Sequence, residues 1–258
     1  MTKTALVTGA AKRIGRAIAI ALANAGYDIG VHFGRSHDDA LALVRELETL
    51  GVKAHAVQGD LSDVATVAGL IDRAREALGP IDVLVNNASV FADDRARSLT
   101  LDSWQMHMDT NLLAPVLLSQ AFAAQSDIRE GASIINMIDQ RVLKPSPPFF
   151  SYSMSKAGLW HATRTLAQAL APNIRVNAVG PGPTLKSIHQ SEADFARVAR
   201  STLLQKPTSP EEVAAAVIYQ SLMAGVPLLN ALLSMQPVLA GASLMLFLIT
   251  YLQYRNRP

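Results

Sequence analysis

The stretch that decides the fold runs from residue 4 to residue 33 and consists of "TALVTGAAKRIGRAIAIALANAGYDIGVHF". A short apolar run leads into a turn framed by Gly9 and Gly15, a helical pattern follows over 14–26, and a second apolar run occupies 28–33. Gly9 permits a tight turn, and Gly15 permits a helix to approach the strand closely. Two apolar runs joined through one helix predict a β-α-β unit with parallel strands.

The same alternation of apolar runs and helical patterns continues along the chain. Strands are expected at 4–8, 28–33, 53–58, 81–86, 132–138 and 174–179, and helices near 14–26, 38–50, 63–78, 102–124 and 151–171. Ser62 is the expected cap of the third helix. The strand runs are continuously apolar, which is typical of a parallel sheet covered on both faces. We therefore predict a single Rossmann-type α/β domain, a doubly wound parallel sheet with helices on both faces and with ligands at the carboxyl ends of its strands.

Composition excludes several classes of function. The 258 residues carry a net charge of only +2, without a long block of like charges, so a nucleic-acid partner is not expected. The chain has no cysteine, which rules out disulfides, thiolate metal ligands and a cysteine nucleophile. The six histidines have no ligand spacing, so no metal site is expected. The apolar run at the N-terminus is too short for a signal peptide, which favours a cytoplasmic protein.

The turn "TGAAKRIG" (8–15) is a candidate phosphate site. The N–H groups at the start of the following helix suit an anion such as a pyrophosphate. The middle glycine of the G-x-G-x-x-G pattern is missing, however, and Arg13 stands in its region. Taken alone, the pattern fits a plain strand-to-helix turn equally well.

The end of the second strand, "VHFGRS" (31–36), indicates which nucleotide would bind. Sites for NAD usually carry an acidic residue here, which holds the ribose 2′-hydroxyl. This chain has Arg35 and Ser36 instead, and a guanidinium can pair with a 2′-phosphate in bidentate fashion. Lys12, Arg13 and Arg16 add positive charge. The segment favours NADPH, and a solvated basic loop is the alternative.

Tyr152 and Lys156 lie four residues apart in "YSMSK", within a helical pattern, so they share one face. An ammonium beside a tyrosine stabilises the phenolate, which lowers the pKa from about 10 and suits the tyrosine to acid–base catalysis. By itself this spacing is common among ordinary surface residues.

Together these motifs identify a family. Over residues 1 to about 215 the sequence resembles the short-chain dehydrogenase/reductase family. The matching segments occur in order: "TGAAKRIG" (8–15), "GDL" (59–61), "NNAS" (86–89), Asn111 in "TNLLAP", "YSMSK" (152–156) and "VNAVGPGP" (176–183). The resemblance implies a Rossmann fold and hydride transfer between a small-molecule substrate and a nicotinamide nucleotide.

The resemblance also implies residue roles. Tyr152 would be the proton donor, Lys156 would bind the nicotinamide ribose and adjust Tyr152, and Asn111 would hold a water in a proton relay. Asp60 and Leu61 would border the adenine. The implied contacts to NADPH or NADP⁺ are Gly9, Lys12, Arg13, Ile14, Gly15, His32, Arg35, Ser36, Asp60, Leu61, Asn87, Ala88, Ser89, Tyr152, Lys156, Pro181 and Gly182.

Asp139 departs from the family pattern, because most members carry a serine thirteen residues before the tyrosine. An ionised carboxylate only accepts hydrogen bonds. It would repel a developing alkoxide by about 4 kcal/mol at about 4 Å with an effective dielectric of about 20. A C=N bond in a heterocycle with N–H and amino donors suits a carboxylate better than a ketone does. The alternative is that Asp139 only accepts N–H groups of its own loop.

One subgroup of the family carries the same departure. Pteridine reductases, and the related dihydromonapterin reductases, resemble this chain in the turn with Arg13, the second strand with His32 and Arg35, and an aspartate at the place of Asp139. They also have a phenylalanine after "NNAS", here Phe91, which in that subgroup stacks on the pterin. The resemblance implies a substrate site formed by Phe91, Asp139 and Tyr152.

The C-terminal part does not follow the family pattern. We predict a nucleotide-binding domain over 1–225, which includes a substrate loop at 183–208 with the character of a mobile lid, and an atypical apolar tail over 226–258. No charged residue occurs between Val213 and Tyr254. Three interpretations stay open for the tail: a buried core or interface helix, a membrane-associated segment, which is not favoured, or an aberrant end that lacks the last strand of the sheet. A homo-oligomer, dimer or tetramer, is expected.

Three functions compete at this point. The leading hypothesis is an NADPH-dependent reductase of pteridine-reductase type, with Tyr152 as general acid and Asp139 as a positioning or relay group. The second is an ordinary carbonyl reductase or alcohol dehydrogenase. The third is a dinucleotide-binding protein impaired in catalysis by its altered C-terminus.

Overall fold

The computed structural model of the protein describes residues 2–187 and 190–222. These residues contain one six-stranded sheet in the order β3-β2-β1-β4-β5-β6, in which every neighbouring pair of strands is parallel. The strands are β1 (Lys3–Val7), β2 (Tyr27–Phe33), β3 (Ala54–Gln58), β4 (Val83–Asn86), β5 (Ser133–Met137) and β6 (Arg175–Val179). Each overlaps the apolar run predicted for it, and the doubly wound Rossmann-type class is confirmed.

Helices fill the connections between the strands. They are α1 (Arg13–Asn24), α2 (His37–Thr49), α3 (Val64–Ala68), α4 (Leu70–Leu78), α5 (Leu101–Met108), α6 (Ala114–Ala123), α7 (Phe150–Leu170), α8 (Glu192–Arg200) and α9 (Pro210–Leu222), with a π-helical turn η1 (Asp109–Leu113) and a 3₁₀ turn η2 (Gln140–Val142).

Two of the helix predictions are wrong in detail. The helix expected over 63–78 is divided at Gly69 into α3 and α4, and its cap is Asp63 rather than Ser62, because the Asp63 carboxylate accepts a backbone N–H two residues on at 3.0 Å. The helix expected over 102–124 consists of α5, η1 and α6 in succession. A π-helical turn inserts an extra residue, which sequence periodicity does not reveal.

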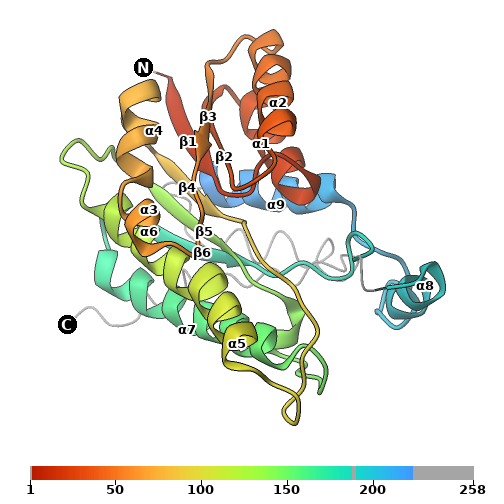
Figure 1. The fold of residues 1–258 in the computed structure, drawn as a ribbon. Coiled ribbons are helices and arrows are strands. Elements are labelled where there is room, and N and C mark those ends of the chain that lie inside the picture. Colours follow the sequence, from red (N-terminus) through yellow and green to blue (C-terminus); the bar gives the residue numbers. More distant parts are fainter. Residues whose placement is uncertain (1, 188–189, 223–258) are drawn as a thin grey trace.

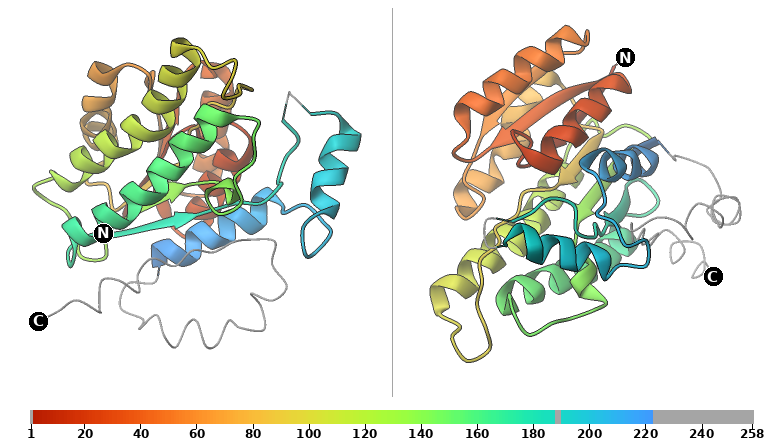
Figure 2. Two further views of the ribbon diagram at one scale, coloured as in Figure 1. Left: turned by 90° about the horizontal axis from the view of Figure 1, so that it is seen from below. Right: turned by 90° about the vertical axis from the view of Figure 1, so that its right-hand side faces the viewer.

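The sheet is the middle of three layers (Figure 1). Helices α1, α2 and α9 cover one face of the sheet, and α4, α6 and α7 cover the other. Both views of Figure 2 show the same arrangement. Each face has its own apolar core, one centred on Ile18 and Leu22 of α1, the other on Leu118 and Phe122 of α6. Burial of both faces explains why the strands are continuously apolar.

Helix α8 projects away from these layers (Figures 1 and 2). It lies within the predicted substrate loop, which therefore contains a helix. The predicted boundary at residue 225 and the apolar segment 226–258 lie outside the described residues. Within the part of the chain that is described, no helix is long and apolar enough to cross a membrane. The expected homo-oligomer stays a prediction.

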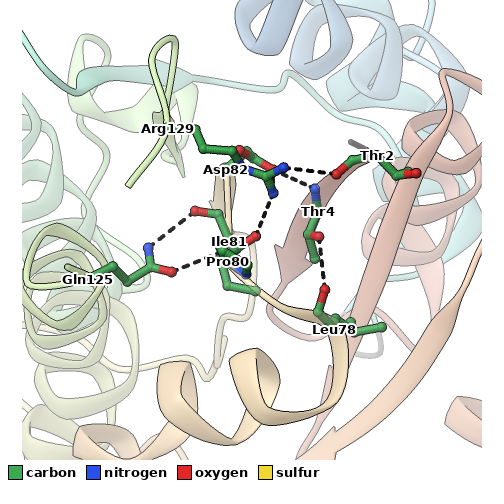
Figure 3. A network of polar contacts seen from close by, with 8 residues as sticks. All are labelled: Thr2, Thr4, Leu78, Pro80, Ile81, Asp82, Gln125 and Arg129. Carbon is green, nitrogen blue, oxygen red and sulfur yellow. Dashed lines mark hydrogen bonds and ion pairs between the residues drawn. The ribbon is translucent and has the colours of Figure 1, made fainter. Parts of the chain in front are cut away.

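A polar network ties together the amino ends of β1 and β4 (Figure 3). The buried carboxylate of Asp82 accepts hydrogen bonds from the N–H of Thr4 and from Nη2 of Arg129, both at 2.6 Å. Arg129 also donates to the carbonyls of Thr2 and Pro80, at 3.0 and 2.9 Å. Burial raises the pKa of Asp82, and the Thr4 N–H and the Arg129 guanidinium oppose that rise.

We predict that Arg129→Met lowers the free energy of unfolding by about 2 kcal/mol near neutral pH, because a buried carboxylate loses its charged donor. Loss of the cation also raises the pKa of Asp82 further above its unfolded value. The folded variant therefore gains stability on protonation, and its deficit shrinks as the pH falls through that range. Urea denaturation at several pH values measures both effects.

The matched control is Arg197→Met, which removes an exposed ion pair with Asp194 and should change the unfolding free energy little. An Arg129→Met deficit of the same size at every pH would contradict the role given to Asp82.

Candidate active site

The turn after β1 is shaped by close approach of backbone to backbone. Gly9 has φ of +62°, a left-handed conformation that glycine adopts without strain. A Cβ atom on Gly15 would lie 2.2 Å from the Gly9 carbonyl oxygen and 2.6 Å from Nδ2 of Asn87. Both glycines are therefore required where the sequence predicted them. Arg13 also has a positive φ, +54°, so the missing middle glycine is replaced by a strained residue.

The end of β4 is fastened to this turn. Oγ1 of Thr8 accepts the N–H groups of Asn87 and Ala88, at 2.9 and 3.0 Å. Nδ2 of Asn87 donates to the carbonyl of Thr8 at 2.8 Å. Asn87 and Ala88, predicted as cofactor contacts, thus also hold two strand ends in register.

The side chain of His32 in β2 is hydrogen-bonded to the turn that follows β1. Its Nδ1 accepts the N–H of Gly9 at 3.1 Å, and its Nε2 lies 3.1 Å from the carbonyl of Gly59, which requires a neutral ring protonated on Nε2. Burial lowers the pKa of His32 to about 4, in agreement with a neutral ring. Its role in the structure is to position the phosphate-site turn, and direct contact with a cofactor stays a prediction.

The predicted basic residues have different surroundings. Lys12 pairs with Asp39 of α2 at 2.8 Å, and Arg16 pairs with Glu46 at 2.5 Å. Both pairs are exposed and join α1 to α2. Sequence alone could not indicate these partners, because they depend on how the two helices pack.

Arg35 lies exposed after β2, just before Ser36 and the start of α2. Its charge acts on Asp60, whose carboxylate accepts the N–H and hydroxyl of Ser62 at 2.9 and 2.7 Å. The Ser62 hydroxyl and N–H, with Arg35, hold the pKa of Asp60 below its usual range. Leu61 is buried beside them. These residues therefore form one group at the ends of β2 and β3.

Tyr152 and Asp139 meet directly. The Tyr152 hydroxyl donates to Oδ2 of Asp139 at 2.8 Å, and Oδ1 of Asp139 accepts the N–H of Arg141 at 2.8 Å. The second bond makes Asp139 the cap of η2. One oxygen of the carboxylate therefore serves its own loop and the other accepts from the tyrosine, while its contact with a substrate stays a prediction.

Charge and burial determine where the protons reside. Burial and the Asp139 carboxylate raise the pKa of Tyr152 well above 10, so its phenol is protonated. Burial lowers the pKa of Lys156 to about 8, against the opposing effect of Asp139. Lys156 donates to the carbonyl of Met137 at 2.8 Å, and its Nζ lies 5.8 Å from the centre of the Tyr152 ring. The pKa of Tyr152 is therefore raised by burial and by Asp139, and the lowering that the sequence led us to expect from Lys156 is not found.

Asn111 lies in the π-helical turn η1 and is fully buried. Its Oδ1 accepts the Ser89 hydroxyl at 3.1 Å and the N–H of Val90 at 2.8 Å. Its Nδ2 donates to the Val90 carbonyl at 3.0 Å and to Ser155 at 3.2 Å. The side chain therefore fixes the loop that follows β4, and the predicted water relay stays a prediction.

Many of the predicted residues line one pocket of about 430 Å³ at the carboxyl ends of β1, β4, β5 and β6. They are Arg13, Ile14, Asn87, Ser89, Phe91, Asp139, Tyr152, Lys156, Pro181 and Gly182. The other predicted residues do not line it: Gly9, Lys12, Gly15, His32, Arg35, Ser36, Asp60, Leu61, Ala88 and Asn111. Of the predicted substrate and catalytic residues, Phe91, Asp139, Tyr152 and Lys156 line this cavity, whereas Asn111 does not.

Aromatic rings form one wall. Phe91 lies edge-to-face with Tyr152, at 4.7 Å between ring centres, and stacks on Phe149 at 4.2 Å. Phe149 has φ of +60°, uncommon for a bulky residue, and does not line the pocket. It supports the Phe91 ring from outside the cavity.

Sequence reasoning missed several pocket residues. They are Gln140, Arg141, Leu185, Gln190, Phe195 and Val198, with Phe149 behind Phe91. Leu185, Gln190, Phe195 and Val198 fall within the substrate loop predicted at 183–208, but the sequence did not single them out. Gln140 and Arg141 lie in the short turn η2, and their only signal was proximity to Asp139.

A doubly wound sheet with a glycine turn and a tyrosine–lysine pair at its strand ends defines a nucleotide-dependent oxidoreductase. Comparison with known proteins agrees with this class: residues 3–196 match the family described as short chain dehydrogenase. The chain belongs to this short-chain dehydrogenase/reductase family and is an NAD(P)-dependent enzyme.

Individual proteins resemble the chain over most of its length. The FolM alternative dihydrofolate reductase 1 of Brucella suis, solved in complex with NADP, is 43% identical, covers 84% of this chain and 87% of its own, and has a TM-score of 0.81. A short chain dehydrogenase of Burkholderia cenocepacia, also solved with NADP, is 36% identical with a TM-score of 0.80, over 85% and 90% of the two chains. A 3-oxoacyl-[acyl-carrier-protein] reductase of Staphylococcus aureus is 36% identical over 70% of this chain and 74% of its own.

The buried lysine gives a test by pH. Its folded pKa of about 8 lies below the value of about 10.4 in an unfolded chain, so the unfolded state binds more protons between these limits. Stability of the wild type should therefore rise with pH across this window, relative to Lys156→Met, a replacement of similar length. Denaturation curves of both proteins without cofactor, at several pH values from about 7 to 10, measure the difference. Parallel pH dependence of the two proteins would show that Lys156 is not destabilised as an ammonium in the folded state.

Proposed function

We propose that the protein is an NADPH-dependent reductase that acts on a C=N bond of a pteridine-like ring. The observation that carries this proposal is the 2.8 Å hydrogen bond from the Tyr152 hydroxyl to the Asp139 carboxylate inside the pocket. The hydroxyl of the proposed catalytic tyrosine therefore lies next to a carboxylate. An enzyme that reduces ketones would be expected to have a hydroxyl donor at the position of that carboxylate.

The residues present fit a dinucleotide. A cradle at Gly15 that a single Cβ would fill and an exposed Arg35 at the end of β2 suit a pyrophosphate and a 2′-phosphate. Lys156 and the turn at Pro181 and Gly182 border the pocket where the nicotinamide would lie. When bound, NADPH supplies the hydride.

Tyr152 would supply the proton. Its raised pKa keeps the phenol protonated at rest, so it releases its proton only to a base that develops on the substrate. The hydride on carbon and the proton on nitrogen together reduce the C=N bond by two electrons. The resulting phenolate regains a proton from solvent.

Asp139 would select the ring. Its carboxylate accepts hydrogen bonds and stabilises ring N–H and amino donors, whereas it repels an alkoxide. Phe91, which lines the pocket and stacks on Phe149, gives the cavity an aromatic wall that suits a bicyclic ring. Asn111 would act through the loop that it fixes, by keeping Ser89 and Phe91 in place.

Known relatives support this proposal without deciding it. The FolM protein of Brucella suis carries the name of a dihydrofolate reductase, and dihydrofolate contains a dihydropteridine ring. The relative from Staphylococcus aureus carries the name of a 3-oxoacyl reductase, whose substrate is a ketone. The carboxylate at Asp139 is our reason for choosing the first chemistry.

The direct test is oxidation of NADPH with dihydrobiopterin, dihydrofolate and a panel of ketones, including an acetoacetyl thioester. We expect turnover of the dihydropteridines and at least about 100-fold lower kcat/KM for the ketones, since about 4 kcal/mol of repulsion opposes the alkoxide. Equal or faster reduction of the ketones would overturn the proposal.

Replacement of the carboxylate should reverse the preference. In Asp139→Ser a hydroxyl donor replaces the acceptor, so kcat/KM for dihydropteridines should fall about 10-fold or more and that for ketones should rise. Asp102→Ser, at an exposed position in the first turn of α5, is the control. Unchanged dihydropteridine turnover in Asp139→Ser would show that the carboxylate has no part in the reaction.

Arg35 should decide between the two nucleotides. In Arg35→Leu the dissociation constant for NADPH should rise about 10-fold or more, while that for NADH should change little, because only NADPH carries the 2′-phosphate. Fluorescence titration of both nucleotides measures the ratio. Arg45→Leu, an exposed arginine on α2, is the control, and an equal change for both nucleotides in Arg35→Leu would contradict the assignment.

A further inference from the structure

We infer that Arg141 forms an anion-binding subsite at the substrate end of the pocket, so that the preferred substrate carries a carboxylate or phosphate beyond its ring. This inference rests on the proposed function, because the ring's place beside Phe91 and Asp139 determines which part of the substrate reaches Arg141.

The position of Arg141 is the first reason. It lies two residues after Asp139 and lines the same pocket as Asp139, Tyr152 and Phe91. Its backbone N–H holds the Asp139 carboxylate, while its guanidinium extends toward the loop that precedes α7. A substrate ring beside Asp139 would therefore have the guanidinium within reach of a substituent.

The second reason is the uncompensated charge of this guanidinium. Its Nη1 donates to the hydroxyl of Ser146 at 2.6 Å and to the carbonyl of Pro148 at 3.4 Å, and both partners are neutral. Among residues 2–187 and 190–222, no carboxylate lies within ion-pair distance of it. The Asp139 carboxylate does not pair with it: its oxygens accept the Arg141 backbone N–H and the Tyr152 hydroxyl instead.

The other cations near the pocket have different partners. Lys156 is buried and donates to a backbone carbonyl beneath the tyrosine. Arg13 uses its Nη2 to hold the carbonyls of Leu185 and Lys186, at 3.3 and 3.1 Å, and so fastens the substrate loop. Lys186 itself pairs with Glu192 at 2.6 Å. Among the described residues, Arg13 and Arg141 are thus the arginines of the pocket that pair with no acid, and Arg141 is the one that lies beside Asp139.

The third reason is preorganisation. The Arg141 guanidinium lies 4.9 Å from the centre of the Phe149 ring, and that ring stacks on Phe91. Contact with an aromatic face holds a guanidinium in place without using its hydrogen-bond donors. Within the described residues, the recorded hydrogen bonds of this guanidinium all come from Nη1. Nη2 and Nε are two donors that match the two oxygens of a carboxylate or phosphate.

This arrangement gives the pocket one group that prefers hydrogen-bond donors and another that prefers an anion, and the distance between the two groups is fixed by the turn that carries them. Asp139 attracts the hydrogen-bond donors of the ring, and Arg141 attracts an anion at the substituent. A substrate with both features would bind in one orientation, which presents its C=N bond to Tyr152. A carboxylate, as on the glutamate of a folate, and a phosphate ester of a pterin side chain share this chemistry.

The test compares substrates that differ only in the anion. Dihydroneopterin and its monophosphate form one pair, and dihydrofolate and its glutamate diamide form the other. In Arg141→Gln the ratio of kcat/KM for the charged member to that for the neutral member should fall about 10-fold or more, for the pair that the subsite recognises. Any loss common to both members cancels in this ratio, so a general effect on folding or on Tyr152 does not imitate the result.

Two further variants sharpen the comparison. Arg141→Lys keeps the charge but loses the planar fork, so its ratio should lie between those of the wild type and Arg141→Gln. Arg45→Gln should leave both ratios unchanged. A ratio that stays within about twofold of the wild type in Arg141→Gln, for both pairs, would overturn the inference.

A binding measurement separates this inference from the proposed function. Calorimetry with neopterin and neopterin monophosphate, and with folate and its glutamate diamide, on the protein saturated with NADP⁺ requires no turnover. Failure to reduce any dihydropteridine overturns the proposed function, yet tighter binding of a charged pterin that is lost in Arg141→Gln still supports the subsite. Equal binding of charged and neutral pterins, or no binding of either, overturns the subsite whatever the reaction.

Discussion

The structure depends on the contact between the start of α1 and the turn that follows β1. At Gly15 the two backbones are so close that a single methyl group would overlap the Gly9 carbonyl oxygen, at 2.2 Å. The same turn receives hydrogen bonds from the end of β4 through Thr8, and it donates to His32 from the end of β2. Three strand ends are thereby fixed around one turn, and this rigidity defines one side of the pocket.

The other side of the pocket contains titratable side chains whose charged forms are destabilised by burial. Tyr152 and Lys156 are both buried, with Asp139 beside the phenol, and each pKa is displaced toward the neutral form. The Asp139 carboxylate tolerates its position because backbone and phenol donors satisfy both of its oxygens. The result is a proton held on the tyrosine next to a permanent acceptor. Under the proposed function, such a site would release a proton to a substrate that brings its own hydrogen-bond donors.

Sequence reasoning reached the fold and the common face of Tyr152 and Lys156 because both depend on regular elements. Continuous apolar runs gave the strands, and the four-residue spacing of Tyr152 and Lys156 placed them on one face of α7. It failed where local backbone geometry decides. The break at Gly69 and the left-handed conformation of Phe149 leave no periodic signal. The partners of Lys12 could not be predicted either, since they depend on the packing of α1 against α2.

At the short turn η2, two neighbouring side chains of opposite charge bind different partners. Asp139 and Arg141 are two residues apart, yet their side chains do not pair. Capping of η2 turns the carboxylate back toward the Arg141 N–H and Tyr152, while Ser146 and the Phe149 ring draw the guanidinium the other way. Had the two charges paired, the pocket would present a neutral wall to its substrate. Because they are held apart, one loop gives the cavity both an acceptor and a cation, and the separation itself becomes a determinant of which molecule fits.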